Sequence, residues 1–287
     1  MSKAFLTICI LLTTNLVLSQ PSKSGRGVNY DSASRFFSEI FKKNNLSIEV
    51  QTFVLPKANI HTQEGNYYLN SKLMPSFGIG LNYVINQNGA WSICTGIHFR
   101  LIESNLYKSI PNNDLMSAGL PPYDNRPPLI YDKNAFTKIL IPIIVLRRFG
   151  FNKSSFWDIQ SGININYSGL SGDLGIEISV SDTNNRQVPI FNAEFKSNNS
   201  QKPWVSFILG ISKNLILKNK NFVTITFLGE MSRTNFLKAD YEITIPNQPL
   251  SRGTYKVTGS GLGLSVAYTF TGYNKRAVKK YERERKQ

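Results

Sequence analysis

Strict alternation of apolar and polar residues is the feature that most constrains the fold of this chain. In residues 76–85, SFGIGLNYVI, every second position from Phe77 to Ile85 is apolar. Successive side chains of a β-strand point to opposite faces, so a period of two indicates a strand. The same test finds seven further segments, one of them apolar on both faces: 46–55, 91–102, 137–147, 157–167, 204–215, 222–236 and 261–270.

Three glycines near the C-terminus allow a second interpretation. In TGSGLGLSVAYTF (258–270), Gly259, Gly261 and Gly263 could form a loop that binds nucleotide phosphates. Such a loop should follow a strand and begin a helix. These glycines instead run straight into an alternating segment with no helical pattern after it. We therefore interpret them as one face of the last strand, which argues against a nucleotide-binding class.

The connections between the predicted strands alternate in length. Short connections are expected at 86–89, 149–155 and 218–221, and long ones at 56–72, 104–136, 168–203 and 238–252. Short turns at one end and long loops at the other are typical of an up-and-down barrel. The predicted fold is all-β: an eight-stranded antiparallel up-and-down transmembrane β-barrel, with both termini at the short-turn end.

The ends of the chain predict export to an envelope. Residues 1–19 read as a secretory signal, because Lys3 precedes an uncharged stretch that ends at Ser19 and is too short for a spanning helix. Removing it leaves Cys94 as the remaining cysteine, so no intramolecular disulfide can form, which fits a bacterial envelope. The expected divisions of the mature chain are a periplasmic leader at 20–45 with a short helix or a partly ordered segment at 31–44, the barrel at 46–271, and a basic periplasmic tail at 272–287.

The composition of the two strand faces predicts which one meets lipid. The polar face is mostly Gly, Ser, Thr, Asn and Gln, which suits a narrow lumen, whereas the other face is rich in Ile, Leu, Val and Phe. An open sheet in hydrocarbon would leave backbone N–H and C=O groups unpaired, so the sheet must close. Aromatic residues at the ends of the apolar face are expected to form the girdle at the lipid boundary: Tyr83, Trp91, Trp157, Tyr167, Tyr268 and Phe270.

Two segments resemble a known family. KILIPIIVLRRFG (138–150) and GSGLGLSVAYTF (259–270) are similar to strands of the PorT-like outer-membrane β-barrel proteins of Gram-negative envelopes. The resemblance implies an outer-membrane location, contact with outer-membrane lipid, and partners among envelope or secretion-machinery proteins. Within the first segment, Pro142 lacks a ladder donor and should mark a bulge or a lightly paired position.

Few charged residues are predicted to face the lumen. A narrow lumen needs its charges compensated, so we expect Glu49, Arg100, Asp158 and Glu230 to pair with one another. The histidine is expected to form interior hydrogen bonds, and we predict no catalytic residue and no cofactor. His61 has no visible cluster of metal ligands around it in the sequence, so no metal site is expected. The predicted lumen residues are Glu49, His98, Arg100, Asp158 and Glu230.

The remaining charge does not indicate nucleic acid. The net charge is +15, but residues 275–286 alone hold seven Lys and Arg against two Glu, and no nucleic-acid motif accompanies them. We interpret this tail as solvated and predict a non-enzymatic binding or envelope-assembly component. The alternatives are a soluble lipocalin-like ligand-binding barrel and an outer-membrane lipid-modifying or hydrolytic enzyme. Candidate binding residues in the long loops, chosen because aromatic and Arg side chains favour interfaces, are Tyr67, Tyr68, Tyr123 and Arg126.

Overall fold

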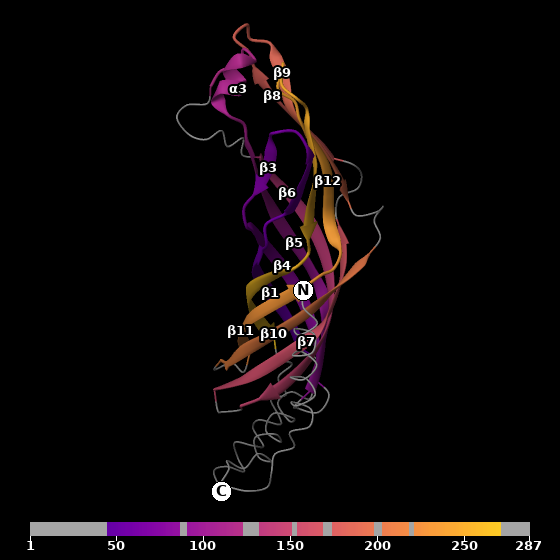
Figure 1. Cartoon of the computed structure of the whole chain (residues 1–287). Helices are drawn as coiled ribbons and strands as arrows, with labels where there is room; N and C mark the ends of the chain where they lie inside the picture. Colours follow the sequence, from indigo (N-terminus) through magenta and orange to yellow (C-terminus); the bar gives the residue numbers. More distant parts are fainter. Residues whose placement is uncertain are drawn as a thin grey trace, which may run out of the picture.

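Eight strands close into an antiparallel barrel in the computed structural model (Figure 1). It describes residues 45–86, 91–122, 132–150, 154–168, 174–197, 203–217 and 221–270. Each barrel strand pairs with a neighbour on either side, and the pairing of β5 (Trp91–Ser109) with β6 (Asp132–Phe149) completes the ring. The barrel strands, in order around the ring, are β1 (Asn45–Leu55), β4 (Met74–Asn86), β5 (Trp91–Ser109), β6 (Asp132–Phe149), β7 (Ser155–Ser168), β10 (Trp204–Ile216), β11 (Phe222–Met231) and β14 (Gly261–Phe270).

This topology confirms the predicted up-and-down barrel and all eight predicted strands. Leu46 pairs with Phe270, so the first barrel strand starts and the last barrel strand finishes on the rim that carries the short connections. Three strands differ most from the prediction: β5 and β6 run further toward the long connections, and the segment 222–236 is divided, because β11 ends at Met231. The ladder between β5 and β6 has no paired partner for Pro142, although the register on either side of it is unchanged. Pro142 is therefore lightly paired and not bulged.

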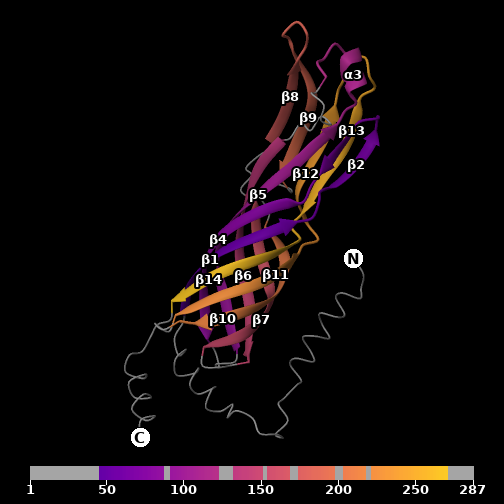
Figure 2. The same cartoon turned by 90° about the vertical axis from the view of Figure 1, so that its left-hand side faces the viewer.

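The long connections are not loops, which corrects the prediction. Three of them contribute to a second, five-stranded sheet that extends beyond the barrel (Figure 2). A short strand that pairs with β5 and a one-turn-and-a-half helix complete this part, which we call the distal module. Its elements are β2 (Asn59–Glu64), β3 (Tyr68–Ser71), α3 (Asn112–Ser117), β8 (Leu174–Ser181), β9 (Gln187–Ser197), β12 (Asn235–Ile243) and β13 (Ser251–Thr258), and the sheet order is β2-β13-β12-β9-β8.

The apolar core of the described chain lies largely in the distal module. Strand β12, NFLKADYEI, buries Leu237, Ala239, Tyr241 and Ile243 and turns the alternate residues from Lys238 outward. Burial of each large apolar side chain stabilises the fold by about 1.5–3 kcal/mol. Tight turns make this possible: Asn185 and Asn247 adopt positive φ values of 60° and 62° beyond the hairpin strands, a conformation that Asn tolerates better than most residues.

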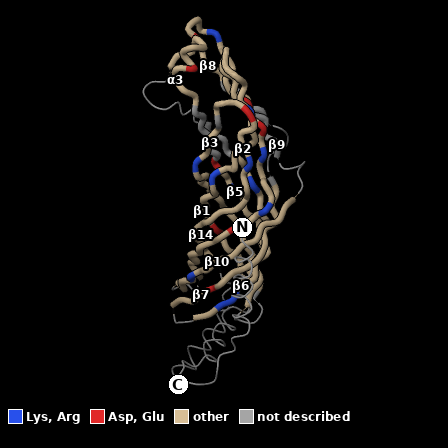
Figure 3. Tube along the Cα trace, viewed as in Figure 1, with Lys and Arg blue, Asp and Glu red and all other residues tan. Residues whose placement is uncertain are grey.

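The faces of the barrel are oriented as the sequence predicted. Outward-facing Ile79 and Leu264 are 56% and 55% exposed, whereas inward-facing Asn164 and Ser265 are 3% and 2% exposed. Figure 3 shows that Lys, Arg, Asp and Glu are sparse along the barrel and more frequent in the distal module. The glycines of the inward face make room for larger neighbours. A Cβ at Gly80 would collide with the imidazole of His98, its partner across the ladder.

Several predictions concern parts of the chain outside the described residues. These are the signal at 1–19, the leader and its helix up to residue 44, the tail at 272–287, and residues 87–90, 151–153 and 218–220 in the short connections. Among the described residues, no helix is long and apolar enough to cross a membrane.

Candidate functional site

The barrel interior contains three polar clusters stacked along its axis. The cluster nearest the distal module is centred on Glu230 of β11, which is fully buried. Its carboxylate accepts hydrogen bonds from Lys138 Nζ at 2.8 Å and Ser206 Oγ at 2.7 Å, and a third from Arg100. A buried carboxylate with this many donors is strongly compensated, and removing it would leave two buried cations.

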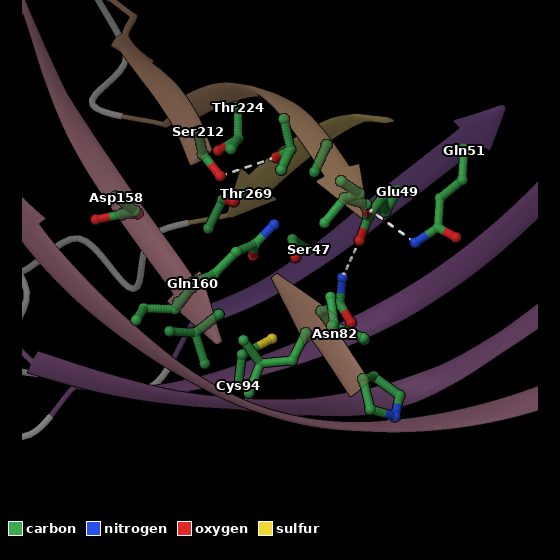
Figure 4. Close-up of a pocket in the computed structure, with 18 of the residues that line it drawn as sticks. Ser47, Glu49, Gln51, Asn82, Cys94, Asp158, Gln160, Ser212, Thr224 and Thr269 are labelled. Atoms are coloured by element: carbon green, nitrogen blue, oxygen red, sulfur yellow. Dashed lines mark hydrogen bonds between the residues drawn. The ribbon is translucent and has the colours of Figure 1, made fainter. Parts of the chain in front are cut away.

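The middle cluster joins β1, β4 and β5 (Figure 4). Gln51 and Asn82 each donate a hydrogen bond to Glu49, and Arg100 donates to Gln51 Oε1 at 3.1 Å. His98 contacts Gln51 Nε2 through Nδ1 at 2.9 Å and Asn82 Oδ1 through Nε2 at 2.7 Å. Since the amide nitrogen can only donate and the amide oxygen can only accept, these contacts fit a neutral imidazole with its proton on Nε2.

The third cluster lies near the short connections. Asp158 of β7 accepts a hydrogen bond from Asn214 Nδ2 at 2.9 Å, and Arg148 Nε lies 3.5 Å from its other oxygen. Thr224 in turn donates to Asn214 Oδ1 at 2.6 Å. The described interior then holds three cations, Arg100, Lys138 and Arg148, and three anions, Glu49, Asp158 and Glu230, so its formal charge is balanced when His98 is neutral.

The structure places all five predicted lumen residues inside the barrel, but their partners differ from the expectation. Arg100 and Glu230 do pair, whereas Asp158 pairs with Arg148, and Glu230 has Lys138 as a second cation. Lys138 and Arg148 were missed because strand β6 is apolar on both faces, so its sequence does not reveal which parity faces inward. One signal in the sequence could have revealed the inward face of β6. Lys138 and Arg148 lie at opposite ends of KILIPIIVLRRFG and are ten residues apart, so they point to the same face of the strand.

A cavity of about 90 Å³ lies among these clusters, lined by a mixture of polar and apolar side chains that includes Cys94 (Figure 4). At about 30 Å³ per water molecule, it has room for a few waters. Pockets for small organic ligands are typically several times larger, about 300–1,000 Å³. The cavity therefore suits hydration of the lumen and not an organic substrate.

An apolar layer closes the interior on the side of the distal module. On β5, β6 and β10 it begins two residues beyond a cluster residue: Ile102 beyond Arg100, Phe136 beyond Lys138, and Trp204 beyond Ser206. All are buried. The layer also covers the cations, because the Arg100 guanidinium lies 3.8 Å from the centre of the Phe53 ring and Lys138 Nζ lies 5.8 Å from that of Trp204. The described residues thus form a barrel whose interior is filled at this level.

The predicted girdle residues all lie on the outside, and most sit at one end. Tyr167 is near the distal end of β7, and the other five lie near the short connections. Two of these five are covered by cations: Arg147 lies 5.3 Å from the Trp91 ring and Lys213 lies 4.5 Å from the Trp157 ring. Tyr268 is only partly exposed, because it packs against Phe270 with ring centres 4.9 Å apart.

The predicted loop-binding set is corrected at Tyr67. Its ring is only 2% exposed and its hydroxyl donates to Asp114 Oδ2 at 2.8 Å, so it belongs to the module core and is not a contact surface. Burial, together with the hydrogen bond and charge of Asp114, raises the pKa of Tyr67 to about 12. Tyr68 begins β3, opposite Ser109 in the ladder. Tyr123 and Arg126 lie outside the described residues.

The predicted absence of a metal site concerned His61, which lies exposed on β2 opposite Thr254. Within the described ranges, no group of three or more His, Cys, Asp or Glu side chains is arranged to hold a metal ion.

Comparisons with known proteins give weak likenesses. No protein-family model matches the chain, and no curated protein matches it. Among solved structures, the outer membrane protein OprG from Pseudomonas aeruginosa is 8% identical with a TM-score of 0.45, over 80% of this chain and 96% of OprG. The beta domain of the Bordetella autotransporter BrkA is 9% identical with a TM-score of 0.30, over 79% and 98%. Ail of Yersinia pestis is 12% identical with a TM-score of 0.23, over 79% and 97%. These values are too low to transfer a location, ligand or activity, so the barrel class rests on this chain's own strand pairing.

Proposed function

We propose that this chain is an integral protein of the bacterial outer membrane, non-enzymatic and closed to diffusion, that binds a partner or supports envelope assembly through its distal module. The observation that carries the proposal is a belt of exposed apolar side chains around a polar, charge-balanced interior. Ile, Leu, Val and Phe form it on seven of the barrel strands, and exposed Trp157 and Tyr167 with half-buried isoleucines continue it across β7. The short connections and both chain ends would then face the periplasm, and the distal module would lie outside the cell.

The belt supports a lipid environment over a soluble one. Monomeric soluble proteins rarely expose contiguous apolar patches of more than a few hundred Å². Here exposed apolar residues recur at every second position from Phe77 to Ile85 of β4, and at most of the outward positions of β1 and β14. A lipocalin-like barrel, the soluble alternative, needs the opposite orientation, with apolar residues inside and polar residues in water. Cation-covered Trp91 and Trp157 at one end of the belt suit a membrane boundary, where aromatic rings and long basic side chains are favoured.

The interior supports a closed and non-catalytic barrel. A general base needs a ring nitrogen that can reach a substrate, yet both nitrogens of His98 are engaged with amide side chains in a buried network. The apolar layer beyond Glu230 separates the cavity from the distal end. An eight-stranded barrel is normally filled by its own side chains, and this lumen follows that pattern.

The role in secretion or envelope assembly comes from the resemblance of residues 138–150 and 259–270 to PorT-like proteins. A closed barrel with a folded module beyond the membrane suits such a role, because the module offers a preformed surface while the barrel anchors it. The partners would be envelope or secretion-machinery proteins and outer-membrane lipid.

Two measurements test the proposal. Cell fractionation should recover the mature protein in detergent-extracted outer membranes, with heat-modifiable mobility on a gel. In planar bilayers, the reconstituted protein should give no steady conductance. Release of the mature protein into the soluble periplasm without detergent would overturn the membrane assignment, and a large steady conductance would overturn the closed barrel while leaving the membrane assignment intact.

A further inference from the structure

Three lysines occupy one row of the ladders in the distal sheet. In the ladders, Lys238 of β12 is opposite Lys196 of β9 on one side and Lys256 of β13 on the other. Lys238 is exposed and Lys256 half-buried, and each lies between buried neighbours, so both side chains point outward. Residues directly opposite one another in a sheet have Cβ atoms about 4.5–5.5 Å apart, and like charges there are destabilising.

A second row on the same face shows how this sheet compensates charge elsewhere. Arg252 lies opposite Glu242 and Glu64 in the ladders, with its Nε 2.9 Å and its Nη1 3.5 Å from their carboxylates. By contrast, Lys238 and Lys256 form no ion pair within 4 Å with any acidic residue that the structure describes. Between the two rows lies Asp240, which is opposite Thr254 and Glu194 in the ladders. No ion pair within 4 Å joins Asp240 to Lys238 or Lys256 among the described residues, so these two lysines can accept an anion from outside the chain.

The position of the lysine row indicates which anion it meets. Lys256, Thr258, Ser260 and Leu262 follow one another on the outer side of the continuous run from β13 to β14, and Leu262 is the first exposed residue of the apolar belt. Six residues span about 20 Å along a strand, and about 14 Å along the membrane normal for a strand tilted by about 45°. The row therefore lies just beyond the belt, on the side where phosphorylated headgroups and sugars of an outer leaflet would surround the protein.

Further lysines lie at the belt edge elsewhere. Exposed Lys72 directly precedes exposed Leu73. Lys57 lies in the connection from β1 to β2. This connection is close to the end of β3, before Lys72, because the Ala58 backbone N–H donates to Ser71 Oγ at 2.7 Å. Figure 3 shows Lys and Arg gathered at the level of β3 and β9, with Asp and Glu above them. Lys57 and Lys72 thus place further basic residues at the edge of the belt.

We infer that this level binds the phosphate groups of an anionic lipid in the outer leaflet, with Lys238 and Lys256 as principal contacts. The inference rests on the proposed membrane location. Lysine binds phosphate as a point charge, and each basic residue near an anionic membrane surface contributes on the order of 1 kcal/mol. A lipid phosphate between two cross-strand lysines would also remove their mutual repulsion. The apolar belt directly below favours a lipid over a soluble polyanion.

The experiment uses the full mature protein in phosphatidylcholine nanodiscs, with bis-phosphorylated lipid A as the probe. The test variant is Lys238→Gln/Lys256→Gln. The matched control, Arg147→Gln/Lys213→Gln, removes two cations at the opposite end of the belt. Binding at low salt should weaken by roughly tenfold or more in the test variant and by less than about twofold in the control. Lipid A without phosphates should bind the wild type as weakly as it binds the test variant.

Stability measurements separate a binding role from a structural one. Without lipid A, the unfolding midpoint of Lys238→Gln/Lys256→Gln should equal or exceed that of the wild type, because like-charge repulsion is removed. With lipid A, only the wild type and the control should gain stability. Equal lipid A affinity of the test variant and the wild type, or full competition by inorganic phosphate at matched concentration, would overturn the lipid site. Failure of the wild type to enter nanodiscs would instead contradict the proposed membrane location.

Discussion

The barrel and the distal module place opposite chemistry on their inner and outer faces. In β14 the inner face holds Gly263 and Ser265 and the outer face Leu264, whereas in β13 the inner face holds Tyr255 and the outer face Lys256. Odd-numbered residues face inward in both β13 and β14, so the orientation of the two faces is the same throughout 251–270. What changes is which face carries the apolar side chains. The same chain therefore satisfies two surroundings, and the inversion near residues 258–262 indicates where lipid would give way to water.

The inner face changes at the same level on several strands. In β1, Gln51 is followed on the inward side by Phe53, and Phe53 lies opposite Gly263 in the ladder to β14. A barrel in lipid can have a polar interior because its outer surface is already solvated by apolar chains, whereas a module in water needs an apolar core to be stable. Substitutions should therefore show that the barrel depends on its polar interior for stability and the distal module on its apolar core.

The largest effect is expected in the barrel, from Glu230→Ala. This change leaves Arg100 and Lys138 buried without their carboxylate, and breaking a buried ion pair in this way costs about 3–5 kcal/mol. The free energy of unfolding, measured in detergent micelles with denaturant, should fall by that amount. Glu242→Ala removes an exposed carboxylate from the module and should cost less than about 1 kcal/mol. Equal losses of unfolding free energy in the two variants would contradict the view that Glu230 compensates the buried charges of Arg100 and Lys138.

A core truncation should have the next largest effect, but in the module. Leu237→Ala deletes a fully buried side chain, and such deletions cost about 2–5 kcal/mol. Limited proteolysis should then cut the distal module more rapidly while the barrel keeps its heat-modifiable mobility. Lys238→Ala, at the adjacent exposed position, is the control and should behave like the wild type in this assay. Simultaneous loss of the barrel in Leu237→Ala would show that the two regions fold as one unit.

The difference between the two regions also explains what the sequence could predict. The barrel strands could be predicted because all except β6 are long runs of alternation, such as SFGIGLNYVI in β4. The module strands carry a weaker signal: β13, SRGTYKVT, has only Tyr255 and Val257 as large apolar residues, and a register shift interrupts β12 between Asn235 and Leu237. Moreover, β2 pairs with β13, which is distant in sequence, and such pairing leaves no local pattern.

Within the lumen, prediction reached the inward-facing charges but not their complete network. Alternation alone places Glu49, Arg100 and Glu230 on the polar face. Arg148 lies directly opposite Asp158 in the β6–β7 ladder, so this pair was missed because the inward parity of β6 was not assigned. Lys138 of β6 and Glu230 of β11 are on strands that do not pair with each other, so this contact needed the closed geometry. Tyr67 was misassigned for a related reason: an aromatic residue in a long connection looks exposed unless that connection is known to fold.

A charge placed on the outer face should separate the two regions by their surroundings. Val266→Arg puts a cation in the middle of the apolar belt, where lipid exposure would cost about 2–4 kcal/mol. Thr254→Arg puts the same side chain on the outer face of the module and should cost less than about 0.5 kcal/mol. Folding into phosphatidylcholine vesicles, followed by denaturant titration, measures both. Similar values for the two variants would argue against a lipid-facing belt.

The smallest effect is expected from Tyr67→Phe, which removes the hydroxyl that donates to Asp114 in the module. Below pH 10 this variant should be less stable by about 1 kcal/mol, the usual contribution of one hydrogen bond. The folded-state pKa of Tyr67 is raised to about 12 from 10.0, so the neutral phenol stabilises the fold fully below pH 10, and this contribution is lost as the pH rises from 10 toward 12. The stability difference between wild type and Tyr67→Phe should therefore shrink across that window. Denaturant titrations of both proteins at pH 8 to 12 measure it, and other base-sensitive groups cancel because they are common to both chains. A difference that stays constant to pH 12 would mean that ionisation of Tyr67 is not linked to folding of the module.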